Sequence, residues 1–206
     1  YYGWYLAEKE DNDIWFDEFH AAHPEAVIGL SEYGADANPA YQSENPEKGD
    51  WSEPYQALYH EHMLKMWRER PYIWAMHCWN MFDFGAAHRT EGDRPGINDK
   101  GLVTHDRKVK KDAFYFYKAN WNPEPMVYIA GRRSVNRVKP VTEVQIFSNC
   151  AEVTLKVNGQ IIKKMQPDGV KVCIFKDIRL KKGENNIEVS AKNDKRVITD
   201  ACCWIL

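Results

Sequence analysis

Glu32 has the place in the sequence that best suits a carboxylate for chemistry. It directly follows the apolar run 26–30 and belongs to the segment Ser31–Gly34. An apolar run of this length indicates a buried parallel strand, and barrel enzymes keep their reactive groups at the carboxyl ends of such strands. The other interpretation is a carboxylate that only pairs with a neighbouring cation. We therefore treat Glu32 as the first candidate for a catalytic group.

A second candidate group follows another apolar segment. Residues 74–84 predict a further buried strand, and this segment ends in aromatic and polar side chains such as Trp79 and Asn80. Groups of this kind hold a sugar, because the apolar C–H face of a pyranose packs on an indole ring while the hydroxyls need polar partners. A tryptophan on a strand also suits a plain core position, and this alternative for Trp79 stays open.

The elements around these two segments predict a parallel sheet covered by helices. Apolar residues recur at helical spacing in residues 11–23, 52–70 and about 110–120, and Pro24 and Pro71 end the first two of these helices. The order strand, helix, strand is typical of a βαβ unit. About two strands and three helices are far fewer than a closed eight-stranded barrel contains.

The last part of the chain shows a different period. Pro123 and Pro125 mark a linker over residues 122–125, and apolar and polar residues then alternate through residues 126–206. Asn158 and Gly159 form a strong hairpin signal, and residues 182–184 predict another turn. The sequence therefore predicts an α/β part over residues 1–121, the linker, and a small antiparallel β-sandwich.

Charge and hydropathy restrict the classes of function. Residues 1–100 hold 8 Lys/Arg and 19 Asp/Glu, whereas residues 101–206 hold 20 and 11. The basic charges of the second half alternate with apolar residues, as on a solvated sheet face, so no nucleic-acid partner is expected. No apolar stretch approaches the roughly 18 residues that span a bilayer. We expect a soluble protein, with a cytoplasmic, periplasmic or secreted location left open.

No metal centre is predicted from the sequence. The five cysteines lack metal-ligand spacing, and Cys202 and Cys203 are adjacent. His77, His88 and His105 share no element at ligand spacing. These residues therefore predict small buried thiols and ordinary histidines.

Four motifs, residues 1–5, 31–36, 79–84 and 98–102, occur in the order typical of one enzyme family. With them, residues 1–121 resemble the C-terminal part of glycoside hydrolase family 2, the β-galactosidase and β-glucuronidase group. The resemblance implies an α/β plus all-β fold, the last portion of a (β/α)8 TIM barrel followed by an immunoglobulin-like β-sandwich. It also implies a retaining exo-β-glycosidase that acts on a terminal β-linked oligosaccharide or glycoconjugate.

The resemblance assigns roles to four residues. Glu32 is the nucleophile, which attacks the anomeric carbon and forms a covalent glycosyl-enzyme that water then hydrolyses. Tyr1 takes the place of a tyrosine that hydrogen-bonds to the nucleophile, and Trp79 forms the floor of the sugar subsite. Tyr5 matches a tyrosine near the substrate, although a core position suits it equally well.

The acid/base of this mechanism is expected outside the sequence. In the family it is the Glu of an Asn-Glu pair on an earlier barrel strand, and no such pair occurs here. The chain also begins without Met, so we expect an N-terminal part of the same polypeptide to supply the acid/base, and the fragment alone to be inactive or to associate. The alternative from another class is a non-catalytic carbohydrate-binding or interaction fragment that uses the sandwich. Homo-oligomer formation is left open.

The loop over residues 94–101 discriminates between substrates. β-Glucuronidases carry Asn-x-Lys there, whose lysine meets the C6 carboxylate, and this chain has Asn98 and Lys100 with Arg94 at the family's arginine position. A charge-assisted contact favours a glucuronide over the neutral sugar. In the alternative, Lys100 pairs with Asp99 or Asp93 and the substrate is a galactoside. No cofactor is expected for the glucuronidase, whereas a galactose-type site could include sodium or magnesium.

Overall fold

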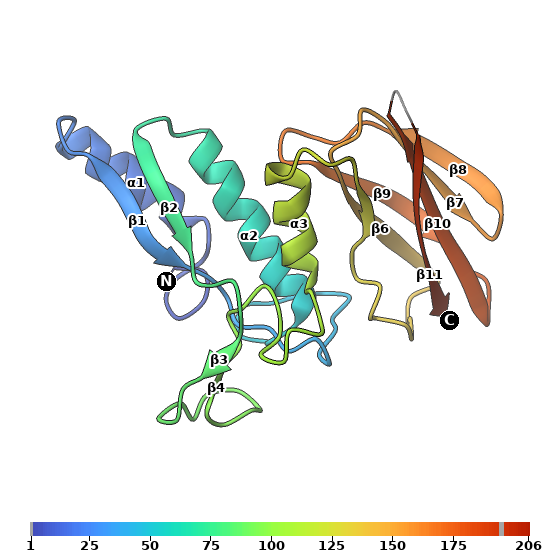
Figure 1. Ribbon diagram of the computed structural model, residues 1–206, viewed down its shortest axis with the longest axis horizontal. Helices are drawn as coiled ribbons and strands as arrows, with labels where there is room; N and C mark the ends of the chain where they lie inside the picture. The colour runs from blue at the N-terminus through green and yellow to red at the C-terminus, as the bar shows by residue number, and fades with distance from the viewer. Residues whose placement is uncertain (1, 194–195) are drawn as a thin grey trace. The chain divides into compact units, whose positions relative to one another are not determined.

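The computed structural model describes residues 2–193 and 196–206, and Figure 1 shows the order of its elements. The chain divides into a first compact unit that ends at Phe114 and a second that begins at Tyr115, so the division lies within helix α3 (Asp112–Trp121). The sequence places the division at residues 122–125 instead, and that boundary stays a prediction. Every helix in the described residues is too short or too polar to cross a membrane.

A parallel strand pair is the centre of the first unit. Helix α1 (Asp11–Ala22) precedes strand β1 (Ile28–Tyr33), and helix α2 (Glu53–Arg68) connects β1 to strand β2 (Ile73–Cys78). The predicted βαβ unit is therefore confirmed. Two short strands, β3 (Phe84–Gly85) and β4 (Ile97–Asn98), form an antiparallel pair in the loops that follow β2, as Figure 1 shows.

The two parallel strands differ in extent from the prediction. β1 begins after Val27, which is 82% exposed, and it continues through Glu32. β2 ends at Cys78, so Trp79 lies just beyond the strand. Within the described residues Gly29, Ser31 and Trp74 are exposed, whereas Ile28, Tyr33 and Ile73 are buried, so the burial of both strand faces stays a prediction for a sheet with more strands than these two. Side chains on a strand point to opposite faces, and only one set of them reaches the core of this unit.

Helix α2 begins where the sequence predicts. The Oγ of Ser52 accepts a hydrogen bond from the backbone N–H of Tyr55 at 3.2 Å, and Pro54 lies in the first turn, where its missing N–H costs nothing. The buried face of the helix is less apolar than its spacing suggested, because Gln56 and His60 are both fully buried.

His60 makes stability depend on pH. It is fully buried beside the rings of Tyr33 and Tyr59, and burial lowers its pKa from 6.5 to about 3. The unfolded chain binds a proton below pH 6.5 and the folded chain does not until about pH 3, so the free energy of unfolding falls as the pH drops through this window. Between pH 7 and pH 5 we expect His60 to account for about 2 kcal/mol of that loss.

The test for His60 is denaturant-induced unfolding at pH 7 and pH 5. His60→Met keeps a side chain of similar size without a titrating group, so its free energy of unfolding should fall less than that of the wild type. The same pH dependence in both proteins would contradict the prediction.

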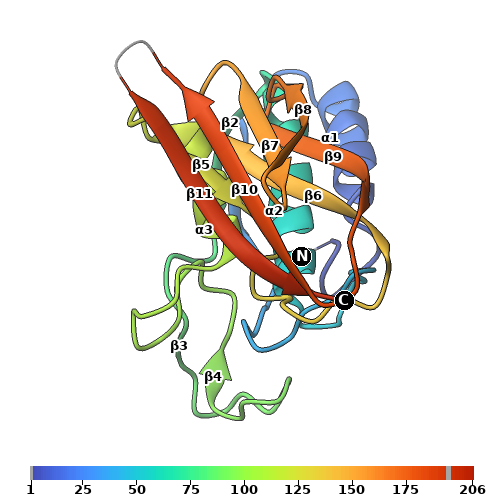
Figure 2. The ribbon, with the colours of Figure 1, turned by 90° about the vertical axis from the view of Figure 1, so that its right-hand side faces the viewer.

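The second unit is a β-sandwich of two antiparallel sheets (Figure 2). The smaller sheet has the order β5-β6-β9, and its strands are β5 (Val127–Ile129), β6 (Val141–Ser148) and β9 (Val172–Arg179). The larger has the order β11-β10-β7-β8, and its strands are β7 (Val153–Val157), β8 (Gln160–Met165), β10 (Glu184–Lys192) and β11 (Val197–Ile205). The predicted sandwich is confirmed.

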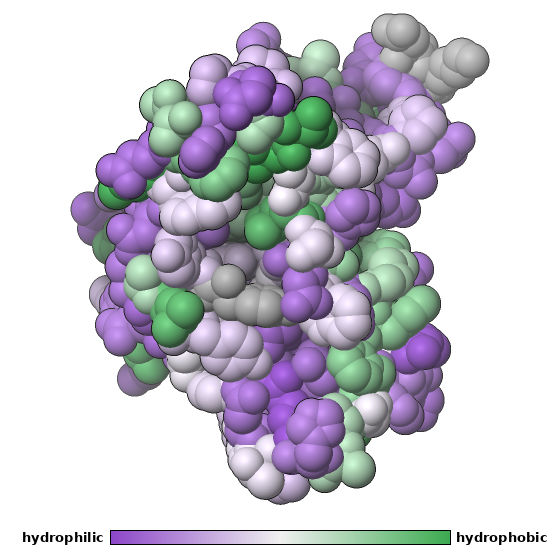
Figure 3. Space-filling model, turned by 90° about the vertical axis from the view of Figure 1, so that its left-hand side faces the viewer, coloured by the Kyte–Doolittle hydropathy of each residue, from purple (hydrophilic) through white to green (hydrophobic). Residues whose placement is uncertain are grey.

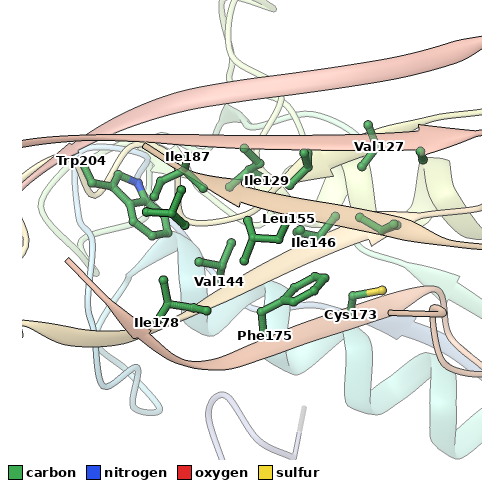
Figure 4. Close-up of a cluster of buried hydrophobic side chains, with 14 of the residues drawn as sticks. Val127, Ile129, Val144, Ile146, Leu155, Cys173, Phe175, Ile178, Ile187 and Trp204 are labelled. Carbon is green, nitrogen blue, oxygen red and sulfur yellow. The ribbon is translucent and has the colours of Figure 1, made fainter. Parts of the chain in front are cut away.

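Side chains from both sheets meet in the core of the sandwich, as Figure 4 shows. Ile146 and Phe175 come from the smaller sheet, and Leu155 and Ile187 from the larger one, and all four are at most 1% exposed. The predicted hairpin joins β7 to β8, and its Asn158 has a φ of 51°, in the left-handed region that this turn requires.

Candidate active site

A cavity of about 480 Å³ lies in the first unit. Its lining residues come from the N-terminal segment, from β1, from the end of β2 and from the loops around β3 and β4: Tyr5, Glu32, Trp79, Phe84, Ala86, His88, Arg89, Thr90, Glu91 and Asn98. Figure 3 shows this side of the molecule, where hydrophilic side chains gather over the β3 and β4 loops. Four of the residues predicted from the sequence, Glu32, Trp79, Tyr5 and Asn98, thus line one cavity.

Parallel pairing brings Glu32 and Trp79 to the same edge of the sheet. The backbone N–H of Trp79 donates to the carbonyl of Tyr33 at 2.7 Å, which places the residue after β2 beside the end of β1. A side chain at Gly34 would put its Cβ 2.0 Å from the Trp79 carbonyl oxygen. Glycine is therefore required at position 34 for the two strand ends to approach.

Glu32 is half-buried at the cavity. Within the described residues its carboxylate forms no ion pair. The alternative of a glutamate that only neutralises a neighbouring cation therefore has no support in this part of the chain.

Two aromatic side chains present open surface to the cavity. Trp79 is 38% exposed and meets Phe84 edge to face, with ring centroids 5.8 Å apart, and Tyr5 is 45% exposed. These fractions contradict the core alternative for both residues. The indole face of Trp79 has the apolar surface that packs against a pyranose.

Lys100 lies beneath the cavity rather than in its wall. It is 1% exposed, and its ammonium group pairs with the carboxylate of Asp36 and donates to the hydroxyl of Tyr5 at 2.7 Å. Burial lowers the pKa of Lys100, and the carboxylate of Asp36 opposes that effect. Lys100 thus forms an ion pair, as the alternative expected, but its partner is Asp36 instead of Asp99 or Asp93.

Arg94 also belongs to an ion-pair network instead of the cavity lining. Its guanidinium pairs with Asp99 and, at 3.3 Å, with Asp83. Asp83 in turn accepts from Lys111 at 2.8 Å, and both of these side chains are completely buried. The network connects the two ends of the loop that carries Asn98.

Asn98 joins that loop to the cavity. On β4 it pairs with Phe84 of β3, and its side-chain Oδ1 accepts from the backbone N–H of Lys100 at 3.0 Å. The remaining candidate, Tyr1, lies outside the described residues, so its predicted contact with Glu32 stays a prediction.

Arg89 lines the cavity and was missed from the sequence. One of its Nη atoms donates to Asp36 Oδ1 at 2.8 Å and to the Tyr5 hydroxyl at 3.3 Å. Arg89 lies just before the charge-rich loop, where the sequence has no periodic pattern. Its neighbours in the sequence therefore give no indication that this arginine belongs to the site. Only the approach of Asp36, which is 53 residues away in the sequence, reveals its role.

No group of three His, Cys, Asp or Glu side chains in residues 2–193 and 196–206 is arranged to hold a metal ion. His88, Glu32 and Glu91 all line the cavity, but they are not arranged as a metal-binding group. The expectation of no resident metal stays a prediction.

Comparison with known proteins links the chain to carbohydrate-active enzymes. No family model matches the chain. Over 206 residues the chain is 47% identical to a β-glucuronidase of Bacteroides fragilis, and the alignment covers 97% of this chain and 30% of that protein. The chain thus spans about a third or less of the length of such relatives.

Solved structures match over the whole chain. An FMN-binding β-glucuronidase from Faecalibacterium prausnitzii has a TM-score of 0.91 at 45% identity, with 100% of this chain and 31% of that one covered. A putative β-galactosidase from B. fragilis has a TM-score of 0.94 at 35% identity, covering 100% and 32%. The β-glucuronidase 2 of Bacteroides uniformis, covalently bound to cyclophellitol-6-carboxylate aziridine, has 0.87 at 29% identity, covering 100% and 25%.

These similarities agree with the motifs and with the elements of both units. The parallel β1–β2 pair with its helices is the C-terminal portion of a (β/α)8 barrel, and the second unit is an immunoglobulin-like β-sandwich. The chain belongs to the β-galactosidase and β-glucuronidase group of glycoside hydrolase family 2.

Proposed function

We propose that this chain carries the nucleophile and part of the sugar-binding surface of a retaining exo-β-glycosidase that hydrolyses β-glucuronides. The observation that carries the proposal is the meeting of Glu32, Trp79 and Asn98 at one cavity, from three segments far apart in the sequence. A carboxylate beside an exposed indole and an amide suits a pyranose whose anomeric carbon lies at the carboxylate.

Glu32 performs the first chemical step in this proposal. Its carboxylate oxygen attacks the anomeric carbon, the bond to the aglycone oxygen breaks, and the acid/base donates a proton to that oxygen. Water then attacks the glycosyl-enzyme, gives its proton to the acid/base and releases Glu32. The two carboxyl groups of a retaining enzyme lie about 5 Å apart. We assign the acid/base to an earlier strand of the full-length polypeptide, outside these residues.

The relatives favour a glucuronide as the substrate. The B. fragilis relative at 47% identity is a β-glucuronidase, and the ligand bound covalently to the B. uniformis enzyme carries a 6-carboxylate. A galactoside is the second candidate. It is supported by the putative β-galactosidase structure and by Lys100, whose charge is already paired with Asp36.

Hydrolysis by two carboxyl groups requires no cofactor, and we expect none for the reaction of this chain. FMN binding is a property of the F. prausnitzii protein, and the candidate cavity gives no separate reason to assign a flavin here. A bound sodium or magnesium ion belongs to the galactoside alternative.

The sandwich gives little support to a carbohydrate-binding module as the alternative. Its aromatic residues that could form a sugar platform are all buried, with exposed fractions of at most 3%: Tyr128, Phe147, Phe175 and Trp204.

The test is a comparison of an aryl-β-glucuronide with an aryl-β-galactoside on the full-length polypeptide. We expect kcat/KM to be at least about tenfold higher for the glucuronide, since a charge-assisted contact to the C6 carboxylate contributes on the order of 1.5–3 kcal/mol. A higher value for the galactoside would favour the second candidate. Turnover of neither sugar would refute the glycosidase proposal.

A further inference from the structure

One indole side chain supports two segments of the cavity wall from behind. Trp51 lies in the loop of residues 34–52 between β1 and α2, half-buried and outside the cavity lining of the described residues. Its ring meets Trp4 edge to face, with ring centroids 5.1 Å apart. It also packs against the backbone of Gly92, where an added Cβ would lie 2.7 Å from the indole Nε1. The indole therefore contacts both the N-terminal segment and the loop of residues 86–96 between β3 and β4.

Each of these two segments carries residues of the cavity wall. Trp4 is 5% exposed and directly precedes Tyr5, which lines the cavity. The β3–β4 loop supplies residues 88–91 to the same lining, and Gly92 follows them directly. Because the buried ring of Trp4 and the backbone of Gly92 both pack against Trp51, neither segment can shift toward the other without displacing this indole.

The backbone of Trp51 is itself held in an unusual conformation. Its φ is 53°, in the left-handed region that bulky residues rarely adopt. The carbonyl oxygen of Trp51 accepts from the backbone N–H of Asn38 at 2.9 Å, and the side chain of Asn38 donates to Asp93 at 2.7 Å. Such a backbone conformation persists only where the surrounding contacts enforce it, and it occurs most often at functional sites.

We propose that Trp51 is a positioning residue of the sugar-binding cavity, which holds the wall that carries Tyr5 and the wall formed by residues 88–91 at the separation that the substrate requires. The inference rests on the proposed function. Glu32 and Trp79 are fixed instead where β1 and β2 pair. Loss of the indole therefore weakens substrate binding much more than it slows the chemical step.

The first test removes the indole from the full-length enzyme. Trp51→Ala should raise KM for an aryl-β-glucuronide by about tenfold, while kcat stays within about threefold. Trp51→Phe keeps an aromatic ring between Trp4 and Gly92 and should restore most of the loss. Partial unfolding lowers the amount of active enzyme, and thus the apparent kcat, without changing KM. An unchanged KM, or a loss in kcat alone, would overturn the inference.

The second test acts on the same contact from the loop. Gly92→Ala places a methyl group closer to the indole than side chains approach, and should raise KM by about 5- to 10-fold. Gly49→Ala is the matched control, because Gly49 has a φ of 81° against 73° at Gly92. Among the described residues, apart from its chain neighbours, no heavy atom lies within 4 Å of the added Cβ at Gly49. This variant adds similar backbone strain without the contact, and should leave KM within about twofold. Equal effects of the two substitutions would contradict the inference.

A double-mutant cycle shows whether the two residues act through their contact. In the Trp51→Ala background the new methyl group meets no indole, so Gly92→Ala should raise KM by less than about twofold further. If thermal unfolding shows that Trp51→Ala does not fold, the comparison of Gly92→Ala with Gly49→Ala decides the question. Independent effects of the two substitutions refute the positioning role and leave the glycosidase in place. A wild-type enzyme that hydrolyses neither aryl-glycoside refutes the proposed function and the inference with it.

Discussion

Glu32→Gln in the full-length polypeptide is expected to lower kcat by a factor on the order of 10⁴ or more, while KM for an aryl-glucuronide stays within a few-fold. The amide has nearly the shape of the carboxylate but is a far weaker nucleophile, so the covalent intermediate no longer forms. A loss of this size corresponds to about 5 kcal/mol of transition-state stabilisation. Binding of the sugar on Trp79 does not depend on the charge at Glu32.

Steady-state kinetics and covalent labelling check this prediction together. Glu25→Gln removes an exposed carboxylate of the same unit, near the start of β1, and is expected to keep wild-type turnover. A 2-deoxy-2-fluoro glucuronide donor should label the peptide that contains Glu32, and mass spectrometry identifies the site. Retained turnover in Glu32→Gln, or a label on another carboxylate, would remove Glu32 from the role of nucleophile.

Lys111→Met is expected to lower the free energy of unfolding by about 3–5 kcal/mol. The ammonium of Lys111 lies 2.8 Å from Asp83 Oδ1 and 2.8 Å from the carbonyl oxygen of Asp99. Burial lowers the pKa of Lys111 and raises that of Asp83, and each charge opposes the shift of the other. Removal of the lysine leaves the Asp83 carboxylate buried with the 3.3 Å contact to Arg94 as its remaining ion pair in the described residues, beside a hydrogen bond from the backbone of Gly101.

Denaturant titration of a double-mutant cycle measures this coupling. Asp83→Asn together with Lys111→Met should cost less than the sum of the two single variants, because neither buried charge is then left alone. Lys108→Met, at an ion pair whose lysine side chain is 80% exposed, should change stability by less than about 0.5 kcal/mol. A loss below about 1 kcal/mol in Lys111→Met would show that the pair contributes little to the fold.

The same pair connects stability to the candidate site. Lys111 binds both ends of the segment between Asp83 and Asp99, and this segment carries Arg89 and Asn98. We therefore expect Lys111→Met to weaken sugar binding even where the protein remains folded.

Local signals account for the elements that could be predicted from the sequence. Ser52 is the cap residue directly before α2, Pro54 lies in the first turn of that helix, and Asn158 lies in the turn between β7 and β8. In these cases the residue that specifies the helix start or the turn lies within a few residues of that element. The local sequence is therefore enough to predict the element. Burial of both faces of β1 and β2 cannot be judged from local signals, because it depends on what packs against each face.

The sequence by itself determined that Glu32 lies near the carboxyl end of a parallel strand and that Trp79 lies near the end of the next one, because strand order and hydrophobic pattern place both at one edge of the sheet. Only the tertiary structure decided which charges pair. Lys100 pairs with Asp36, which is 64 residues away in the sequence, instead of with its neighbour Asp99. Arg89 lines the cavity from a loop in which the sequence shows no periodic pattern. In a charge-rich loop each charged side chain has several possible partners at similar sequence separation. Which of them form ion pairs depends on burial and on distances in the folded chain.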